Sequence, residues 1–406
     1  MDLTLESAYE LDAGDALWRQ RARFLRPGDD VIYLAGNSLG LQPRGARALL
    51  DHRLREWGEA AVLAWHDSDW MEVEDAVAAS MARIVGARPH EVAVTGTLTV
   101  NLHLLMASFY RPAGTRTAIL MEPDAFPSDQ YAAAGQAAWH GLTPSEHVLT
   151  AEAGTDEGLI EALDRFGDRI ALVLLSGVNY YTGRVFDMQR VTEHARAAGC
   201  LVGLDLAHAA GNVPLYLHDW DVDFAAWCGY KYLNGGPGAP AALFVHERHH
   251  TADLPRLAGW WGHDPASRFQ MPDRFLPARG ASGWQVSTPS VLALAPLQAS
   301  MAMFDEVGMP ALLEKSRKLT GFLSELIVHK SPAVEIITPQ ARGAQLSLKV
   351  PGGRATFDAL RALGVVCDWR EPDVIRVAPT PFYNGFAEMV RFVDRLERAL
   401  SEAGRP

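Results

Sequence analysis

Short apolar runs that alternate with helical patterns constrain the fold of this chain more than any other feature. The runs Thr117–Met121, Ile170–Leu175 and Cys200–Leu204 are apolar throughout, as expected for strands that helices cover on both faces. Between the last two lies Asp187–Gly199, in which the aspartate is suited to cap a helix and the glycine to end it. A strand, a helix and a strand in so short a stretch form a βαβ unit, which predicts a parallel sheet.

The order of the predicted elements divides the chain into two domains. Its 406 residues, 48% of them hydrophobic, exceed what one hydrophobic core normally covers. We expect a large α/β domain over residues 60–305, with further strands at Val92–Val94, Val222–Trp227 and Ala241–His246. Residues 306–406, together with 1–59, are expected to form a smaller α+β domain. Its predicted elements are a connecting helix over 311–329, strands at Ala333–Ile337, Gln345–Val350, Val365–Asp368 and Val374–Val377, and a last helix at Phe386–Ala403.

Composition excludes several classes of protein. The net charge of −12 argues against a partner that is nucleic acid or an acidic membrane. The acidic N-terminus does not resemble a signal peptide, and no uncharged run reaches the ~18 residues of a membrane span. The three cysteines, Cys200, Cys228 and Cys367, form no CxxC pair, so neither a disulfide framework nor a structural zinc site is expected. These observations favour a cytoplasmic enzyme.

An aspartate stands at the end of one predicted strand, where ligands of open α/β sheets bind. Asp205 follows Cys200–Leu204 directly, and a buried acid there needs a cationic partner. The protonated ring nitrogen of pyridoxal 5′-phosphate (PLP) is such a partner, because a carboxylate beside it keeps the ring able to accept electrons. The alternative role for Asp205 is an ordinary helix N-cap.

A lysine stands at the end of a second predicted strand. Lys231 follows Val222–Trp227, lies between two tyrosines and precedes a glycine pair. Most lysines are solvated surface charges. Partial desolvation between aromatic rings favours the neutral amine that Schiff-base exchange requires, and the glycines allow close approach of a ligand. With Asp205 twenty-six residues before it, Lys231 is predicted to carry PLP as a Schiff base.

Two more strand ends offer contacts for the same cofactor. Val92–Val94 leads into a Gly/Thr turn that opens a helical run, and free backbone N–H groups at such a helix start suit a phosphate. A plain capped turn would show the same residues. Thr117–Met121 leads to Phe126, which is suited either to stack on a pyridine ring or to pack in the core.

The chain resembles the kynureninase family over nearly its whole length. The longest matching run extends from Val202 to Gly236 and includes the YKY around Lys231. The other matching segments are GNSLGLQP (36–43), LTVNLHLLMASF (98–109), FPSD (126–129), LSGVNYYTG (175–183), GWWGH (259–263) and IRVAP (375–379). The resemblance implies a PLP-dependent homodimer of fold type I, with a large, mostly parallel-sheet domain and a smaller α+β domain. It also implies hydrolysis of L-kynurenine to anthranilate and L-alanine in tryptophan catabolism.

The resemblance implies roles for individual residues where the motifs match. Lys231 would hold the cofactor and remove the Cα proton, and Asp205 would pair with the ring nitrogen. Tyr230 is the candidate proton donor, and its alternative role is simple binding of the cofactor phosphate. The implied cofactor contacts also include Leu98, Thr99, Phe126, Pro127, Ser128, Asp129, Ser176, His208, Trp260 and Thr288. The implied substrate contacts are Arg376 for the α-carboxylate, His208, Ser38 and Trp65. No metal ligands are implied.

Thr288 departs from the pattern of the animal members of the family. In those enzymes an asparagine at this position helps recognise the 3-hydroxyl group of 3-hydroxykynurenine, on a segment thought to reach the partner subunit's site. Thr288 therefore implies a preference for unsubstituted kynurenine. The implied partners are this small substrate and a second copy of the chain, with the active sites at the interface between them.

Two other interpretations stay open. Another fold-type I PLP enzyme, similar to a cysteine desulfurase or an aminotransferase, would share Asp205 and Lys231. A desulfurase needs a reactive cysteine in a mobile loop, however, and Cys367 lies in a strand-like run. A non-enzymatic protein of the PLP fold would not need both Lys231 and Arg376.

Overall fold

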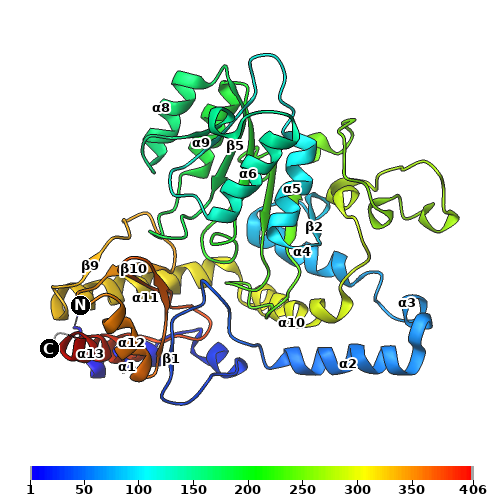
Figure 1. The fold of residues 1–406 in the computed structure, drawn as a ribbon. Coiled ribbons are helices and arrows are strands. Elements are labelled where there is room, and N and C mark those ends of the chain that lie inside the picture. The colour runs from blue at the N-terminus through cyan, green and yellow to red at the C-terminus, as the bar shows by residue number, and fades with distance from the viewer. Residues whose placement is uncertain (1, 404–406) are drawn as a thin grey trace.

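A seven-stranded sheet lies at the centre of the larger part of the molecule (Figure 1). The computed structural model describes residues 2–403. The strands are β2 (Val92–Val94), β3 (Ala118–Met121), β4 (Val148–Thr150), β5 (Ile170–Ser176), β6 (Leu201–Asp205), β7 (Phe224–Trp227) and β8 (Ala242–Val245), in the order β2-β8-β7-β6-β5-β3-β4. β8 is antiparallel to both of its neighbours, and the other pairs are parallel. The predicted mostly parallel sheet is confirmed.

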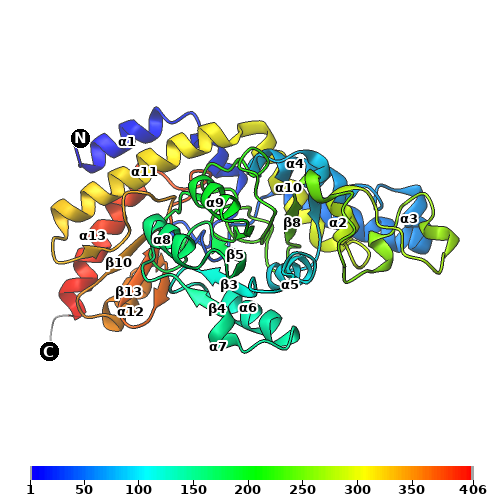
Figure 2. The same cartoon turned by 90° about the horizontal axis from the view of Figure 1, so that it is seen from above.

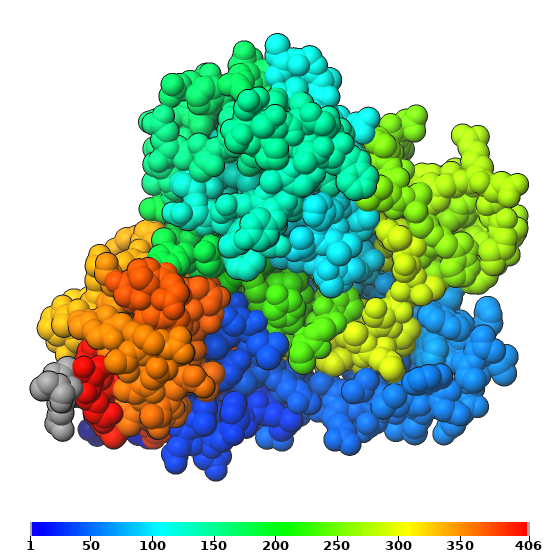
Figure 3. Space-filling model, in the orientation of Figure 1, coloured from blue at the N-terminus to red at the C-terminus, as the bar shows by residue number. Residues whose placement is uncertain are grey.

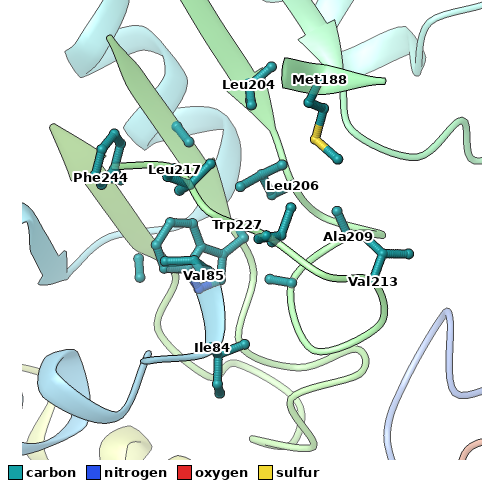
Figure 4. Close-up of a cluster of buried hydrophobic side chains, with 14 of the residues drawn as sticks. Ile84, Val85, Met188, Leu204, Leu206, Ala209, Val213, Leu217, Trp227 and Phe244 are labelled. Atoms are coloured by element: carbon teal, nitrogen blue, oxygen red, sulfur yellow. The ribbon is translucent and has the colours of Figure 1, made fainter. Parts of the chain in front are cut away.

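Helices cover both faces of this sheet because its strands are apolar on both sides. They are α4 (Val73–Val85), α5 (Leu98–Phe109), α6 (Pro127–Trp139), α7 (Pro144–His147), α8 (Asp156–Phe166) and α9 (Met188–Ala197). The caps of α9 are as predicted: the side chain of Asp187 accepts a hydrogen bond from the N–H of Arg190, and Gly199 has a φ of +76°. Figure 4 shows part of the core on one face, where Trp227 lies among Val85, Leu206 and Leu217.

A second, antiparallel sheet with its own buried cluster forms the smaller part of the molecule. Its strands are β9 (Glu335–Ile336), β10 (Leu346–Lys349), β12 (Asp368–Arg370) and β13 (Val374–Val377), in the order β12-β13-β10-β9. The helices here are α1 (Leu5–Ala13), α11 (Met309–Lys330), α12 (Arg354–Ala362) and α13 (Phe386–Ala403). Figure 2 shows α1, α11 and α13 together at one end of the molecule, beside both termini.

The predicted single strand Val365–Asp368 is wrong. Val365 and Val366 form β11, which pairs in parallel with β1 (Ile32–Tyr33), whereas β12 starts at Asp368 and pairs with β13. Cys367 lies between β11 and β12, which belong to different sheets. The pairing with β1 also brings the N-terminal segment to the smaller part, and Ile32 is buried in its core. The domain division at residues 59/60 and 305/306 stays a prediction.

An arm extends from the body and consists of α2 (Gly45–Ala60), η2 (Ala61–Leu63), α3 (Ala64–Asp67) and the nearby 250–285 segment (Figures 1 and 3). α2 packs along α10 (Val291–Val307). The remaining 3-10 helices are η1 (Trp18–Arg23), η3 (Pro89–Glu91), η4 (Glu247–His249), η5 (Trp260–Gly262), η6 (Arg268–Gln270) and η7 (Gly280–Trp284). Among residues 2–403, the helices are all too short or too polar to cross a membrane.

Candidate active site

A cavity of about 360 Å³ lies at the carboxyl ends of the central strands of the large sheet. Asp205 is the last residue of β6 and pairs in register with Ser176, the last residue of β5. Lys231 follows β7, the next strand in the sheet. The cavity brings together twelve of the predicted site residues: Ser38, Leu98, Thr99, Phe126, Ser128, Asp129, Ser176, Asp205, His208, Tyr230, Lys231 and Arg376.

Two buried carboxyl groups lie beside each other in this cavity. Asp205 is 4% exposed and Asp129 is 2% exposed. Burial, together with the neighbouring Asp205 carboxylate, raises the pKa of Asp129 well above its usual value. Within residues 2–403, Oδ1 of Asp129 has no hydrogen-bond partner. Two adjacent acids away from water cannot both be ionised unless a cation lies close to them, and a protonated pyridine nitrogen is one such cation.

Asp205 does not act as a helix N-cap. Its Oδ1 accepts a hydrogen bond from the N–H of Ala207 at 2.7 Å, but the next regular element after β6 is β7. This bond fixes the carboxylate at the cavity. Phe126 is likewise not a core residue, because it is 42% exposed and meets Tyr180 edge-on with a centroid distance of 5.1 Å. Both residues line the cavity.

The amine of Lys231 faces the same cavity. Its Nζ lies 3.0 Å from Nε2 of His208, and the two groups share a hydrogen bond. Burial, helped by the positive charges of Lys231 and Arg376, holds the pKa of His208 well below its usual value. The imidazole is therefore neutral and adds no second positive charge beside the lysine amine. Tyr230 lies beside the amine, and burial raises the pKa of its phenol to about 12.

Two helix N-termini form a cradle for an anion on another wall of the cavity. α5 begins at Leu98 after Gly96, whose φ of +55° favours glycine, and α6 begins at Pro127. The hydroxyl groups of Thr99 and Ser128 hydrogen-bond to each other across this cradle at 2.7 Å. Free backbone N–H groups, hydroxyls and the positive ends of two helices suit the phosphate of PLP.

The opposite wall belongs to the smaller sheet and is positively charged. Arg376 in β13 is 1% exposed and donates to the carbonyl oxygen of Tyr180 at 2.6 Å. It also forms an ion pair with Asp368, which accepts hydrogen bonds from Ser38 and from Arg370, the latter at 3.2 Å. Although burial raises the pKa of Asp368, Arg376 and the Ser38 hydroxyl hold it below its usual value. The two guanidinium groups carry one more positive charge than Asp368 neutralises, so this wall suits the binding of one further carboxylate.

Four predicted site residues do not line this cavity. Pro127 starts α6 and is exposed, and Thr288 is exposed in the loop before α10. Trp260 is 41% exposed and donates to the carbonyl oxygen of Arg268. Trp65 packs edge-on against Trp70. Their contacts with a cofactor or substrate stay predictions.

The cavity also contains residues that were not predicted individually: Asn37, Val178, Tyr180, Ala207, Arg370, and Thr97 of the predicted Gly/Thr turn. Most of them lie in segments that carried the family resemblance, such as GNSLGLQP and LSGVNYYTG, so those segments were a usable signal. Arg370 had no such signal. It reaches the cavity because β12 pairs with β13, which places it near Arg376.

The same fold occurs in solved structures of PLP enzymes. The chain is similar to C-DES with glycine covalently linked to its PLP cofactor, with a TM-score of 0.79 and 19% identity over 94% of this chain and 98% of that chain. It is also similar to a cysteine desulfurase of Escherichia coli, with a TM-score of 0.78 and 18% identity over 95% and 98%. At this identity the similarity concerns the fold alone. Fold and site together define a PLP-dependent enzyme of fold type I.

Closer relatives identify the family. The chain is 51% identical to the kynureninase of Xanthomonas axonopodis pv. citri (strain 306), over 97% of this chain and 98% of that protein. It is 50% identical to the kynureninase of Xanthomonas campestris pv. campestris (strain B100), over the same shares. Residues 312–396 match the family model of the kynureninase C-terminal domain. The chain belongs to the kynureninase family.

Proposed function

We propose that this enzyme hydrolyses L-kynurenine to anthranilate and L-alanine by cleaving the Cβ–Cγ bond, and that it prefers kynurenine to 3-hydroxykynurenine. The observation that carries the proposal is one cavity in which Lys231 and Asp205 face Arg376. The first two suit PLP, and the arginine suits the α-carboxylate of an amino acid. Close relatives named kynureninase support this choice of amino acid.

Lys231 and Asp205 have the central roles in this proposal. Bound PLP supplies an electron sink for the negative charge that develops at Cα of the substrate. Lys231 would hold the cofactor, and its amine would take the Cα proton of the substrate. Asp205 would keep the ring nitrogen of bound PLP protonated. His208, 3.0 Å from the lysine amine, orients it.

Tyr230 and the arginine wall complete the assignment. The raised pKa of Tyr230 keeps its phenol protonated at neutral pH, so its hydroxyl is available as a donor beside Lys231. Arg376, with Arg370 beside it, binds the α-carboxylate, and Ser38 holds Asp368 against the same guanidinium group.

The cysteines do not favour the desulfurase alternative. A nucleophilic cysteine needs a lowered pKa and an accessible position. Burial raises the pKa of Cys367 to about 12 and also raises the pKa values of Cys200 and Cys228. None of the three lines the cavity.

Kynurenine turnover tests the proposed reaction directly. Purified enzyme saturated with PLP should produce anthranilate fluorescence with L-kynurenine. We expect kcat/KM to be at least about tenfold lower for 3-hydroxykynurenine measured in parallel, because a pocket without a partner for the hydroxyl discriminates at this level. Thr288→Asn should reduce the difference in kcat/KM between kynurenine and 3-hydroxykynurenine. A protein that binds PLP but forms no anthranilate would contradict the substrate assignment and leave the fold class intact.

We also propose that the enzyme is a homodimer whose partner completes the site. Exposed apolar side chains gather on the arm, including Trp57, Val62 and Leu63, with Phe269 and Met271 in the 250–285 segment. Such patches on a soluble enzyme mark interaction sites. Trp260 and Thr288 lie in or near the arm and outside the cavity of their own chain, as expected if they serve the partner's cavity.

Sedimentation equilibrium tests the dimer. The wild-type mass should be twice the 44.3 kDa of one chain. Leu63→Asp places a charge in the apolar patch and should shift the mass toward the monomer and reduce anthranilate formation in parallel. Glu314→Asp on the exposed face of α11 is the matched control and should change neither value. A wild-type monomer with full activity would contradict the proposal.

A further inference from the structure

Glu122 is a buried carboxyl group directly behind the cavity wall, and the proposed reaction does not use it. It follows β3, is 2% exposed and does not line the cavity. β3 and β5 are neighbours in the sheet (Figure 2), so Glu122 lies beside Ser176 at the end of β5. We propose that Glu122 is a positioning residue that, as a neutral acid, holds the Ser176 hydroxyl toward the cofactor.

Both oxygens of Glu122 are used by the same residue. Oε2 accepts a hydrogen bond from the backbone N–H of Ser176 at 3.3 Å, and Oε1 is hydrogen-bonded to Oγ of Ser176. Ser176 lines the cavity and pairs in register with Asp205, which suits the ring nitrogen of PLP. Glu122 therefore fixes both the backbone and the side chain of a cavity residue without contacting the cavity itself.

The charges around Glu122 favour its neutral form. Asp205 and Asp129 are the other carboxyl groups in this buried region, and Lys231 is the nearby amine. Burial and, to a lesser extent, the negative charge of Asp205 raise the pKa of Glu122 to about 7. A ring nitrogen that carries one positive charge is balanced by one carboxylate. Lys231 acts on Asp129, whereas no positively charged group is among the main influences on the pKa of Glu122, so an ionised Glu122 would have no cationic partner.

The neutral form has a consequence for the direction of the hydrogen bonds. A protonated carboxyl group has one O–H donor and one carbonyl acceptor. Because Oε2 accepts from the Ser176 N–H, the proton belongs on Oε1 and is donated to Oγ of Ser176. The hydrogen of the serine hydroxyl is then free to point into the cavity. An ionised Glu122 would instead take that hydrogen and leave only lone pairs toward the cofactor.

Substitution by glutamine distinguishes the two protonation states. A glutamine copies the neutral acid, since its carbonyl accepts from the Ser176 N–H and its amide donates to Oγ. Glu122→Gln should therefore keep the PLP dissociation constant within about threefold of the wild-type value. The pH midpoint of the bound-cofactor absorption band should stay within about half a pH unit of the wild-type midpoint. Glu122→Ala should weaken PLP binding at least about tenfold, because Ser176 loses its support. PLP titration of the apoenzyme provides both readouts.

A double-mutant cycle tests whether Glu122 acts through Ser176. In the Ser176→Ala background, Glu122→Ala should weaken PLP binding by no more than about twofold further. Glu122→Met, which fills the volume, replaces the alanine variant if that variant does not fold. An equal loss for the glutamine and alanine variants contradicts the neutral acid. If Glu122→Ala weakens PLP binding as much in the Ser176→Ala background as in the wild type, the positioning role is contradicted. Neither readout requires kynurenine, so the test of Glu122 is independent of the proposed substrate.

Discussion

Lys231→Ala should remove the visible absorption band of the purified enzyme and lower anthranilate formation by at least about four orders of magnitude. The variant loses both the covalent attachment of PLP and the base that we assign to the Cα proton. PLP is still expected to bind through the helix N-termini and Asp205, and to absorb at shorter wavelength as the free aldehyde. Absorption spectra and anthranilate fluorescence measure the two effects.

The other lysines provide the control. Of the five lysines in the chain, all within the described residues, Lys231 alone lines the cavity. Lys349 is half exposed and pairs with Asp373 in the smaller part of the molecule. Lys349→Ala should leave the spectrum and the turnover unchanged. A Lys231→Ala enzyme that keeps the visible band would show that the cofactor is attached elsewhere.

Arg376→Ala should raise KM for kynurenine and lower kcat/KM by about 10² to 10³-fold, with a smaller change in the binding of PLP. The guanidinium group is buried, and removal of one partner from a buried charged hydrogen bond costs about 2–5 kcal/mol. Arg376→Lys keeps the charge but loses the planar pair of donors, so an intermediate loss is expected. Steady-state kinetics measures KM and kcat/KM for kynurenine. The PLP absorbance of the same variant shows whether the cofactor is still bound, so a defect in substrate binding can be told from a loss of the cofactor.

Asp368→Asn is the matched control for this wall. It removes the negative charge that holds Arg376 but leaves the guanidinium group in place. The loss in kcat/KM should be clearly smaller than for Arg376→Ala. If Arg376→Ala leaves KM for kynurenine unchanged, the α-carboxylate binds elsewhere, and Arg370 becomes the next candidate.

Local sequence signals were sufficient for six of the seven strands of the large sheet and for the residues at their ends, but they missed the edge strand β4. Apolar runs identified the central strands, and the ends of parallel strands meet at one edge. Asp205 and Lys231 could therefore be placed together from their positions in the sequence alone. The caps of α9 were predictable for the same reason, because a capping side chain and a glycine act within a few residues.

Contacts between distant segments could not be predicted in this way. Arg376 lies in the smaller sheet, and only the family resemblance pointed to its role. The break at Cys367 depends on pairing with β1, more than three hundred residues earlier in the chain. Glu122 and Asp368 were missed because their partners, Ser176 and Arg376, are defined by neighbouring strands and not by sequence spacing.

The site of cofactor attachment is the most direct test of the role of Lys231. The wild-type enzyme saturated with PLP is reduced with borohydride, digested and analysed by mass spectrometry. We expect a stable pyridoxyl adduct on the peptide that contains Lys231, and none on the peptides that contain Lys315, Lys318, Lys330 or Lys349. An adduct on one of those four lysines, or no adduct in a protein that has the visible band, would contradict the assignment of Lys231.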